Sequence, residues 1–279
     1  MTAPTHPDYG DEAELDALFD ADYLHFYTLY CSPEIDDEEA NTIEMVCDLS
    51  AEDRVLDLAC GYGRIANRIA RTTGAKVVGI DRSDLLIERA RAESRRLGVD
   101  VEYAVGDMRA LDATEQYDVI VLWFTVFGMF DDDTSRDLLK RCHRALAPGG
   151  RLLVESINRD ADGELASTVF PTVKEVRSDQ GLEFMIDRSS YSPMEGRVYV
   201  ERSITRIGAA PRTIEYSIRL FTYTELRDWL LAAGFEAVHG YGAHGELYDL
   251  ESERMILIAH RGEPTSLTSK QFEHGPKDP

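Results

Sequence analysis

The chain has 279 residues, with 52 acidic and 30 basic side chains and a formal net charge of −22 at pH 7. A protein that binds nucleic acid or an anionic membrane needs a basic surface to neutralise phosphates, so this charge argues against both partners. The longest apolar run, residues 119–130, is too short to span a bilayer, and residues 1–11 lack the basic start and apolar segment of a signal peptide. We therefore expect a cytoplasmic protein.

The four cysteines show no CxxC spacing, and a chain of this length does not need disulfides to stabilise its core. We expect reduced thiols and no bound metal. They are Cys31, Cys47, Cys60 and Cys142.

The first fifty residues predict a flexible leader followed by a helical cap. Residues 1–12 show no apolar periodicity, as expected for a loose leader. From Phe19 to Tyr30, aromatic residues recur at steps of three and four, which predicts one helix over residues 12–30. A second helix is expected from Pro33, a residue favoured in the first turn, to about residue 49. Residues 13–50 then form an N-terminal helical cap.

Residues 51–160 alternate short apolar strands with helices, which predicts an α/β fold with a doubly wound parallel sheet. Ser83 is expected to begin the longest of these helices and Gly98 to end it. Residues 146–151, LAPGGR, are interpreted as a turn. The expected strands are 54–60, 76–81, 101–107, 117–123 and 151–157, and the expected helices are 63–72, 83–97 and 134–146.

Residues 161–221 predict a small antiparallel β insertion, because strand-like segments follow one another without helices. We interpret the insertion as a lid or an interface, and a homodimer is one form that such an interface would take. A helix at 224–233 and a hairpin of strands 235–241 and 254–260 return the chain to the α/β domain, which resumes at residues 222–261. The polar residues 262–279 predict a disordered tail. The expected strands of the insertion are 172–177, 182–191, 197–207 and 213–221.

The strongest chemical signal is residues 57–64, DLACGYGR, between the first strand and the first helix of the α/β part. Gly61 and Gly63 permit a tight turn and close approach of a ligand to the backbone. The match to G-x-G-x-x-A would place the pyrophosphate of a nicotinamide or flavin dinucleotide at the helix N-terminus. We expect Asp57 to face the same crevice, where its charge would repel a pyrophosphate and attract the α-ammonium of S-adenosylmethionine. A third interpretation is a turn with a purely structural role.

Two carboxylates follow the next strands. Asp81 ends the second strand, 18 residues after Gly63, where it can accept the ribose hydroxyls of an adenosine. Both candidate ligands carry a ribose, so Asp81 does not separate them. After the third strand, Asp107 can accept from the exocyclic amine of adenine while Met108 packs on the ring.

With these motifs in order, the chain resembles the class I S-adenosylmethionine-dependent methyltransferases over about residues 53–157 and the closing helix and hairpin. The resemblance implies a Rossmann-like fold whose seven-stranded, mostly parallel sheet has the order 3-2-1-4-5-7-6, with strand 7 antiparallel. It also implies S-adenosylmethionine as the donor and S-adenosylhomocysteine as the product. Ala59 stands where the family's motif usually begins with glycine, a common variant. The N-terminal helices and the β insertion look more narrowly like bacterial small-molecule N- and O-methyltransferases, including those that dimethylate amino sugars.

The candidate site residues fall into three groups. His25 and His244 are candidates for a general base, because imidazole titrates near neutrality, although an amine acceptor needs only desolvation. Aromatic side chains can hold a sulfonium by cation–π attraction. The expected cofactor-binding residues are Tyr23, Tyr27, Asp57, Ala59, Gly61, Gly63, Arg64, Asp81, Arg82, Asp107, Met108, Trp123 and Phe124. The expected substrate-binding residues are Phe127, Phe130, Asn158, Arg159 and Arg219.

Several of these assignments have structural alternatives. Tyr23, Tyr27 and Tyr30 would equally form a helix face that packs on the domain. Arg219 would equally form an ion pair at the surface. At the level of the whole protein, three functions compete: in-line methyl transfer to an N or O atom of a small molecule, an NAD(P)-dependent oxidoreductase, and a non-catalytic binder of S-adenosylmethionine.

Overall fold

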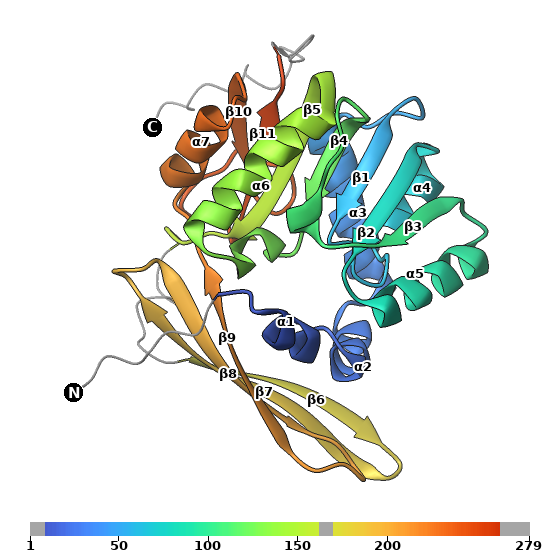
Figure 1. Cartoon of the computed structure of the whole chain (residues 1–279). Coiled ribbons are helices and arrows are strands. Elements are labelled where there is room, and N and C mark those ends of the chain that lie inside the picture. The colour runs from blue at the N-terminus through green and yellow to red at the C-terminus, as the bar shows by residue number, and fades with distance from the viewer. Residues whose placement is uncertain (1–8, 162–169, 263–279) are drawn as a thin grey trace, which may run out of the picture.

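The computed structural model describes residues 9–161 and 170–262, which form two β-sheets and the helices around them (Figure 1). Most of the predicted leader and nearly all of the predicted tail lie outside the described residues. No helix in these two ranges is long and apolar enough to cross a membrane. The four cysteines, all in the described part of the chain, are free and buried.

The larger sheet has seven strands in the order β10-β11-β5-β4-β1-β2-β3. Strands β1 to β5 run parallel, and β11 is antiparallel to both β5 and β10, which confirms the predicted order and the closing hairpin. The strands are β1 (Arg54–Leu58), β2 (Lys76–Asp81), β3 (Val101–Val105), β4 (Tyr117–Leu122), β5 (Leu146–Ile157), β10 (Ala237–Tyr241) and β11 (Arg254–His260).

Helices cover both faces of this sheet. Successive residues of a strand point to opposite faces, and the strands carry apolar side chains on both, so each face forms a core with its own helices. Leu56 of β1 lies in one core with residues of α6 and α7, whereas its neighbour Val55 lies in the other with residues of α3, α4 and α5. Short 3-10 turns follow β3 and β4. The helices are α3 (Pro33–Cys47), α4 (Ala66–Thr73), α5 (Asp84–Leu97), α6 (Asp132–Ala145) and α7 (Tyr223–Ala232), and the turns are η1 (Met108–Ala110) and η2 (Val126–Met129).

Local signals set the ends of α5 as predicted. The Ser83 side chain accepts the Leu86 N–H at its start, and Gly98 ends it in the left-handed conformation. Strand β5, however, begins at Leu146 rather than at Arg151. Leu146 pairs with Tyr117 before a break in register, and the ladder resumes at Arg151, so the predicted turn is an irregularity inside the strand.

The prediction of one helix over residues 12–30 is wrong, because two helices occupy this range: α1 (Glu12–Leu18) and α2 (Ala21–Tyr30). Asp20 has an extended backbone, and its carboxylate accepts the N–H groups of Asp22 and Tyr23, which starts a new helix. Aromatic spacing continues across this boundary, so periodicity alone could not show it.

The smaller sheet confirms the predicted antiparallel insertion, with four strands paired in chain order. Figure 1 shows α1 and α2 between this sheet and the α/β layers. Met185 and Ile204 of the small sheet form a core with Phe26 of α2, so the sheet packs on the helical cap. Its strands are β6 (Phe170–Ser178), β7 (Gly181–Ser192), β8 (Arg197–Thr205) and β9 (Arg212–Arg219).

Candidate functional site

A hollow lies where the carboxyl ends of β1 to β4 meet α1, α2 and the small sheet. Its empty volume is about 970 Å³, which includes space open to solvent at the mouth. One set of lining residues follows β1, β2 and β3, and we call it the strand-tip wall: Ala59, Gly61, Asp81, Arg82, Gly106, Asp107 and Met108. A second set follows β4 or comes from the small sheet, and we call it the far wall: Phe124, Thr125, Val126, Met129, Phe130, Arg202, Tyr216 and Ile218.

The glycine loop bends sharply and exposes its backbone to the hollow. Ala59, Gly61 and Gly63 have φ angles of 66°, 55° and 75°, so alanine occupies a left-handed position that glycine favours. A Cβ added to Gly61 would meet no atom of residues 9–161 and 170–262 within 4 Å, which leaves room for a ligand against the backbone. Gly63 does not line the hollow, and a Cβ there would collide with Tyr103 and Ala90.

Asp81 anchors this loop. Its Oδ2 accepts the Gly61 N–H over 2.8 Å and its Oδ1 accepts the Ser83 N–H over 2.9 Å. Burial raises the pKa of Asp81, and these two backbone hydrogen bonds oppose the increase. Arg82 also lines the hollow and pairs with Asp16 over 2.9 Å.

Asp57 does not line the hollow, contrary to the expectation that it faces the crevice. Strand alternation places it on the same face as Val55, beneath α4. There it makes a backbone hydrogen bond with Ala66, in the first turn of a helix that has no side-chain cap. Its Oδ2 is buried and makes no hydrogen bond to any described residue, and burial raises the pKa of this carboxyl to about 7.

Asp107 and Met108 both line the strand-tip wall. The Arg109 guanidinium donates to both oxygens of Asp107 at 2.5 to 3.0 Å. Burial raises the pKa of Asp107, but the hydrogen bonds from Arg109 outweigh it and lower the pKa overall. The carboxylate that we expect to receive adenine is therefore already part of an ion pair.

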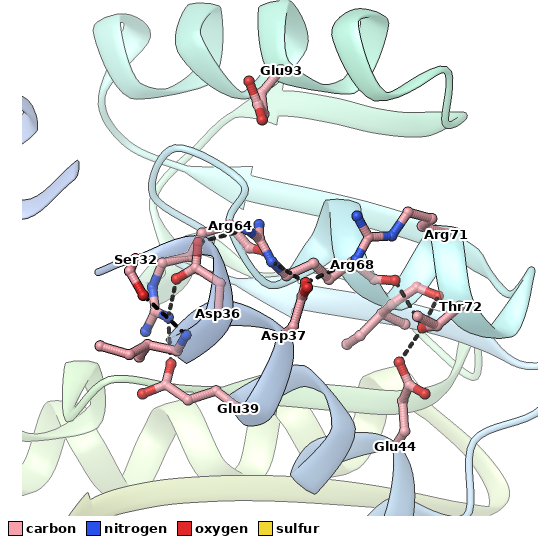
Figure 2. A network of polar contacts seen from close by, with 12 residues as sticks. Ser32, Asp36, Asp37, Glu39, Glu44, Arg64, Arg68, Arg71, Thr72 and Glu93 are labelled. Atoms are coloured by element: carbon pink, nitrogen blue, oxygen red, sulfur yellow. Dashed lines mark hydrogen bonds and ion pairs between the residues drawn. The ribbon is translucent and has the colours of Figure 1, made fainter. Parts of the chain in front are cut away.

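Arg64 lies outside the hollow, in a network of charges between α3 and α4 (Figure 2). Its Nη1 donates to Asp36 Oδ1 over 3.0 Å and makes a close contact with Glu39. Arg68 follows one turn later and pairs with Asp36 and Asp37. Arg64 is 7% exposed, so this network joins the helical cap to the helix that follows the glycine loop.

Aromatic residues from two distant segments meet at the hollow. Tyr23 and Tyr27 both line it and stack at 4.4 Å between ring centroids. Phe124 lies edge-on to Tyr27 at 6.0 Å, and Trp123 donates its Nε1–H to Glu39 over 3.0 Å. The structure thus brings the four predicted aromatic cofactor residues together.

The two predicted base candidates do not line the hollow. His25 Nε2 lies 2.6 Å from Glu183 of the small sheet. His244 is largely exposed, and its Nδ1 lies 3.0 Å from Glu38. Both imidazoles therefore have structural partners away from the hollow.

Of the five predicted substrate-binding residues, the hollow includes Phe130 alone. Phe127 is buried against Phe221, with ring centroids 5.4 Å apart. Asn158 Nδ2 donates to the Ser252 carbonyl over 2.7 Å, which ties β5 to the loop before β11.

Arg159 and Arg219 converge instead on Glu225 at the start of α7. Arg219 also pairs with Asp132 over 3.3 Å. Arg219 is 6% exposed, whereas the side chains of Asp132 and Glu225 are 42% and 28% exposed, so a buried guanidinium pairs with two carboxylates that reach the surface.

Sequence reasoning missed a buried polar group on the far wall. Arg202 of β8 is 3% exposed and donates to both oxygens of Asp187 at 2.7 and 2.8 Å. Its Nη2 also donates to the hydroxyls of Tyr216 and Tyr27, at 2.8 and 3.2 Å. No local motif marks these residues, because the pairing of β7, β8 and β9 and their packing on α2 bring them together.

Comparison with known proteins shows which family this chain resembles in sequence and fold. A family model described as a methyltransferase domain matches residues 55–150. A ubiquinone biosynthesis O-methyltransferase of Chelativorans sp. (strain BNC1) is 37% identical over 107 residues, and this match spans 38% of this chain and 41% of that protein.

Two similarities extend over most of the chain. A dTDP-4-amino-2,3,4,6-tetradeoxy-D-glucose N,N-dimethyltransferase of Saccharopolyspora spinosa is 32% identical over 245 residues, which are 83% of this chain and 92% of that protein. The fold matches the amino pentose methyltransferase CalS10 of Micromonospora echinaspora, solved with S-adenosylmethionine bound, at a TM-score of 0.64 and 20% identity over 87% of this chain and 97% of that one. The chain belongs to the class I S-adenosylmethionine-dependent methyltransferases.

Proposed function

We propose that this protein transfers the methyl group of S-adenosylmethionine to the amine nitrogen of a small molecule of the amino-sugar class. The relative from Saccharopolyspora spinosa supports this class, because its name describes dimethylation of an amino sugar nucleotide and the similarity extends through the small sheet. The observation that carries the proposal is one hollow bounded by both the glycine loop and the small sheet. We assign the small sheet the role of a lid over the acceptor.

The strand-tip wall fits the donor. Asp81 would hold the ribose hydroxyls, Met108 would pack on the adenine, and the bare backbone at Gly61 would border the methionine portion. When bound, S-adenosylmethionine supplies a methyl group activated by the positive charge on sulfur. Tyr23, Tyr27 and Phe124 line the site, where cation–π attraction and exclusion of water would favour that charge.

The far wall favours an amine over a hydroxyl acceptor. No histidine lines the hollow among the described residues, and its two lining carboxylates, Asp81 and Asp107, lie on the strand-tip wall. A hydroxyl of high pKa needs a base to become a nucleophile, whereas a neutral amine already carries a lone pair. Alignment of the two reactants in such a site can contribute about 7–11 kcal/mol to lowering the barrier.

The test is incubation of the purified protein with S-adenosylmethionine and matched pairs of acceptors, each pair an amino sugar nucleotide and its hydroxyl analogue. We expect mass spectrometry to show methylation of the amines alone. Methylation confined to the hydroxyl analogues would contradict the proposal. Binding of S-adenosylhomocysteine without any product would favour a non-catalytic binder.

A further inference from the structure

Two consecutive residues of the far wall have an unusual backbone. Phe124 and Thr125, directly after β4, have φ angles of 68° and 60°. Side chains other than glycine seldom adopt this left-handed region, and a β-branched threonine does so least readily. Such conformations persist only where surrounding contacts enforce them, and they gather at functional sites.

A buried carboxylate enforces this conformation. Glu155 of β5 is 1% exposed, and its Oε2 accepts the Thr125 N–H over 2.7 Å. Glu155 also makes a backbone hydrogen bond with Phe124. Arg254 Nη1 lies 3.8 Å from the other carboxylate oxygen, so the charge of Glu155 has a nearby counterion.

The side chain of Thr125, held in this way, carries a hydroxyl. Thr125 lines the hollow beside Phe124 and Val126. Within residues 9–161 and 170–262 the Thr125 hydroxyl makes no hydrogen bond, and it does not cap η2. Elsewhere in the hollow, the hydroxyls of Tyr27 and Tyr216 already accept hydrogen bonds from Arg202.

We propose that Thr125 orients the acceptor amine by accepting one of its N–H groups, and that Glu155 is a positioning residue that keeps Thr125 in the required conformation. The inference rests on the proposed methyl transfer to an amine. With one N–H held, the lone pair can point to the methyl carbon. The C–N bond then forms while the C–S bond breaks with its electron pair left on sulfur, and the resulting ammonium loses its proton to solvent.

The first test compares Thr125→Val with Thr125→Ser. Valine keeps the shape and removes the hydroxyl, whereas serine keeps the hydroxyl. We expect Thr125→Val to lower kcat for an amine acceptor about tenfold, the effect of one hydrogen bond, and Thr125→Ser to stay within about threefold of the parent. Affinity for S-adenosylhomocysteine, measured by calorimetry, should remain within about twofold in both. Equal kcat in Thr125→Val and the parent, or equal losses in both variants, would overturn the proposal.

The second test asks whether Glu155 acts through Thr125. We expect Glu155→Gln to lower kcat in the parent but to lower it little further in the Thr125→Val background. A merely structural carboxylate would produce the same loss in both backgrounds and would overturn the positioning role. If Glu155→Gln fails to fold, the Thr125 variants still decide the main claim. Failure of the proposed function is distinguishable, because the unmodified protein would then methylate no amine.

Discussion

The carboxylate of Asp81 accepts the backbone N–H of Gly61 over 2.8 Å, although the two residues are twenty positions apart in the chain. This bond ties the glycine loop after β1 to the tip of β2. One side chain therefore fixes the loop that we propose borders the donor, and its remaining acceptor capacity would be available to a ribose. The geometry of the loop and the affinity for the donor should change together when this carboxylate is altered.

Asp81→Asn should weaken binding of S-adenosylhomocysteine by about 10- to 100-fold, the range expected when one or two hydrogen bonds to a charged group are lost. The amide has one acceptor oxygen where the carboxylate uses two, so it cannot satisfy both backbone donors and the ribose. Isothermal titration calorimetry measures the change. The control is Asp84→Asn on the exposed first turn of α5, which should bind like the parent. Equal affinities in the two variants would contradict the role of Asp81.

Gly61→Ala should abolish detectable donor binding while the protein remains folded. The alanine Cβ would occupy the hollow that we assign to the ligand. Gly98→Ala is a matched control, because Gly98 has a φ of 68°, near the 55° of Gly61, and a Cβ there also meets no atom within 4 Å. Both variants should lose about 1–2 kcal/mol of stability from the left-handed backbone. If Gly61→Ala bound the product normally, the ligand would not lie against this loop.

Asp57→Asn should stabilise the protein at pH 8 and have little effect at pH 4. Burial raises the pKa of Asp57 to about 7, above the ordinary value near 3.9. Between these values the folded protein holds a proton that the unfolded chain releases, so stability falls as the pH rises from about 4 to 7. The gain at pH 8 is at most about 4 kcal/mol. Urea denaturation across this pH range measures it, and a gain that does not depend on pH would contradict the assigned burial.

The same variant tests whether the buried charge attracts the donor. Asp57 does not line the hollow, so its charge would act on the donor's ammonium from a distance or through a water held by Oδ2, which makes no hydrogen bond within the described residues. We expect the parent's affinity for S-adenosylmethionine to increase from pH 6 to pH 8 as Asp57 ionises. Asp57→Asn should bind several-fold more weakly at pH 8 and show a flatter profile. Unchanged affinity in the variant would remove the electrostatic argument for this residue.

Arg64→Gln should lower the free energy of unfolding by about 1–3 kcal/mol, because Asp36 and Glu39 each lose a buried charged partner. The loss is limited because Asp36 keeps its ion pair with Arg68 and Glu39 keeps its ion pair with Arg254. Arg71→Gln is the comparison. Arg71 pairs with Asp37 where both side chains are more than 40% exposed, so its loss should cost at most about 1 kcal/mol. Urea denaturation of both variants gives the difference. Similar stabilities would show that the network in Figure 2 does not hold α3 on α4.

Features of the fold set by neighbouring residues could be predicted from the sequence. Ser83 and Gly98 bound α5 through contacts within one turn, and the apolar strands specified the parallel sheet and its hairpin. The boundary at Asp20 could not be predicted, since the aromatic stripe continues through it. Asp20 starts α2 through an extended backbone conformation, and the spacing of the aromatic residues does not indicate that conformation.

Sequence motifs at the strand tips indicated residues that line the hollow, as for Gly61, Asp81 and Met108. Elsewhere the position and the partners of a side chain depend on how the elements pack together. Arg64 has carboxylate partners about thirty residues earlier in the chain, and the alternation of β1 turns Asp57 beneath α4. The contributions of Arg202 and Thr125 depend on strand register and on a left-handed backbone, neither of which a short motif reveals.

A crystal structure with S-adenosylhomocysteine tests the central claim most directly. We predict the ribose hydroxyls within hydrogen-bond distance of Asp81, the adenine on Met108, and the thioether sulfur facing the space between Phe124 and Tyr27. Product bound outside the hollow, or lying in it with the adenine against Arg202 and Tyr216, would contradict the assignment of the two walls.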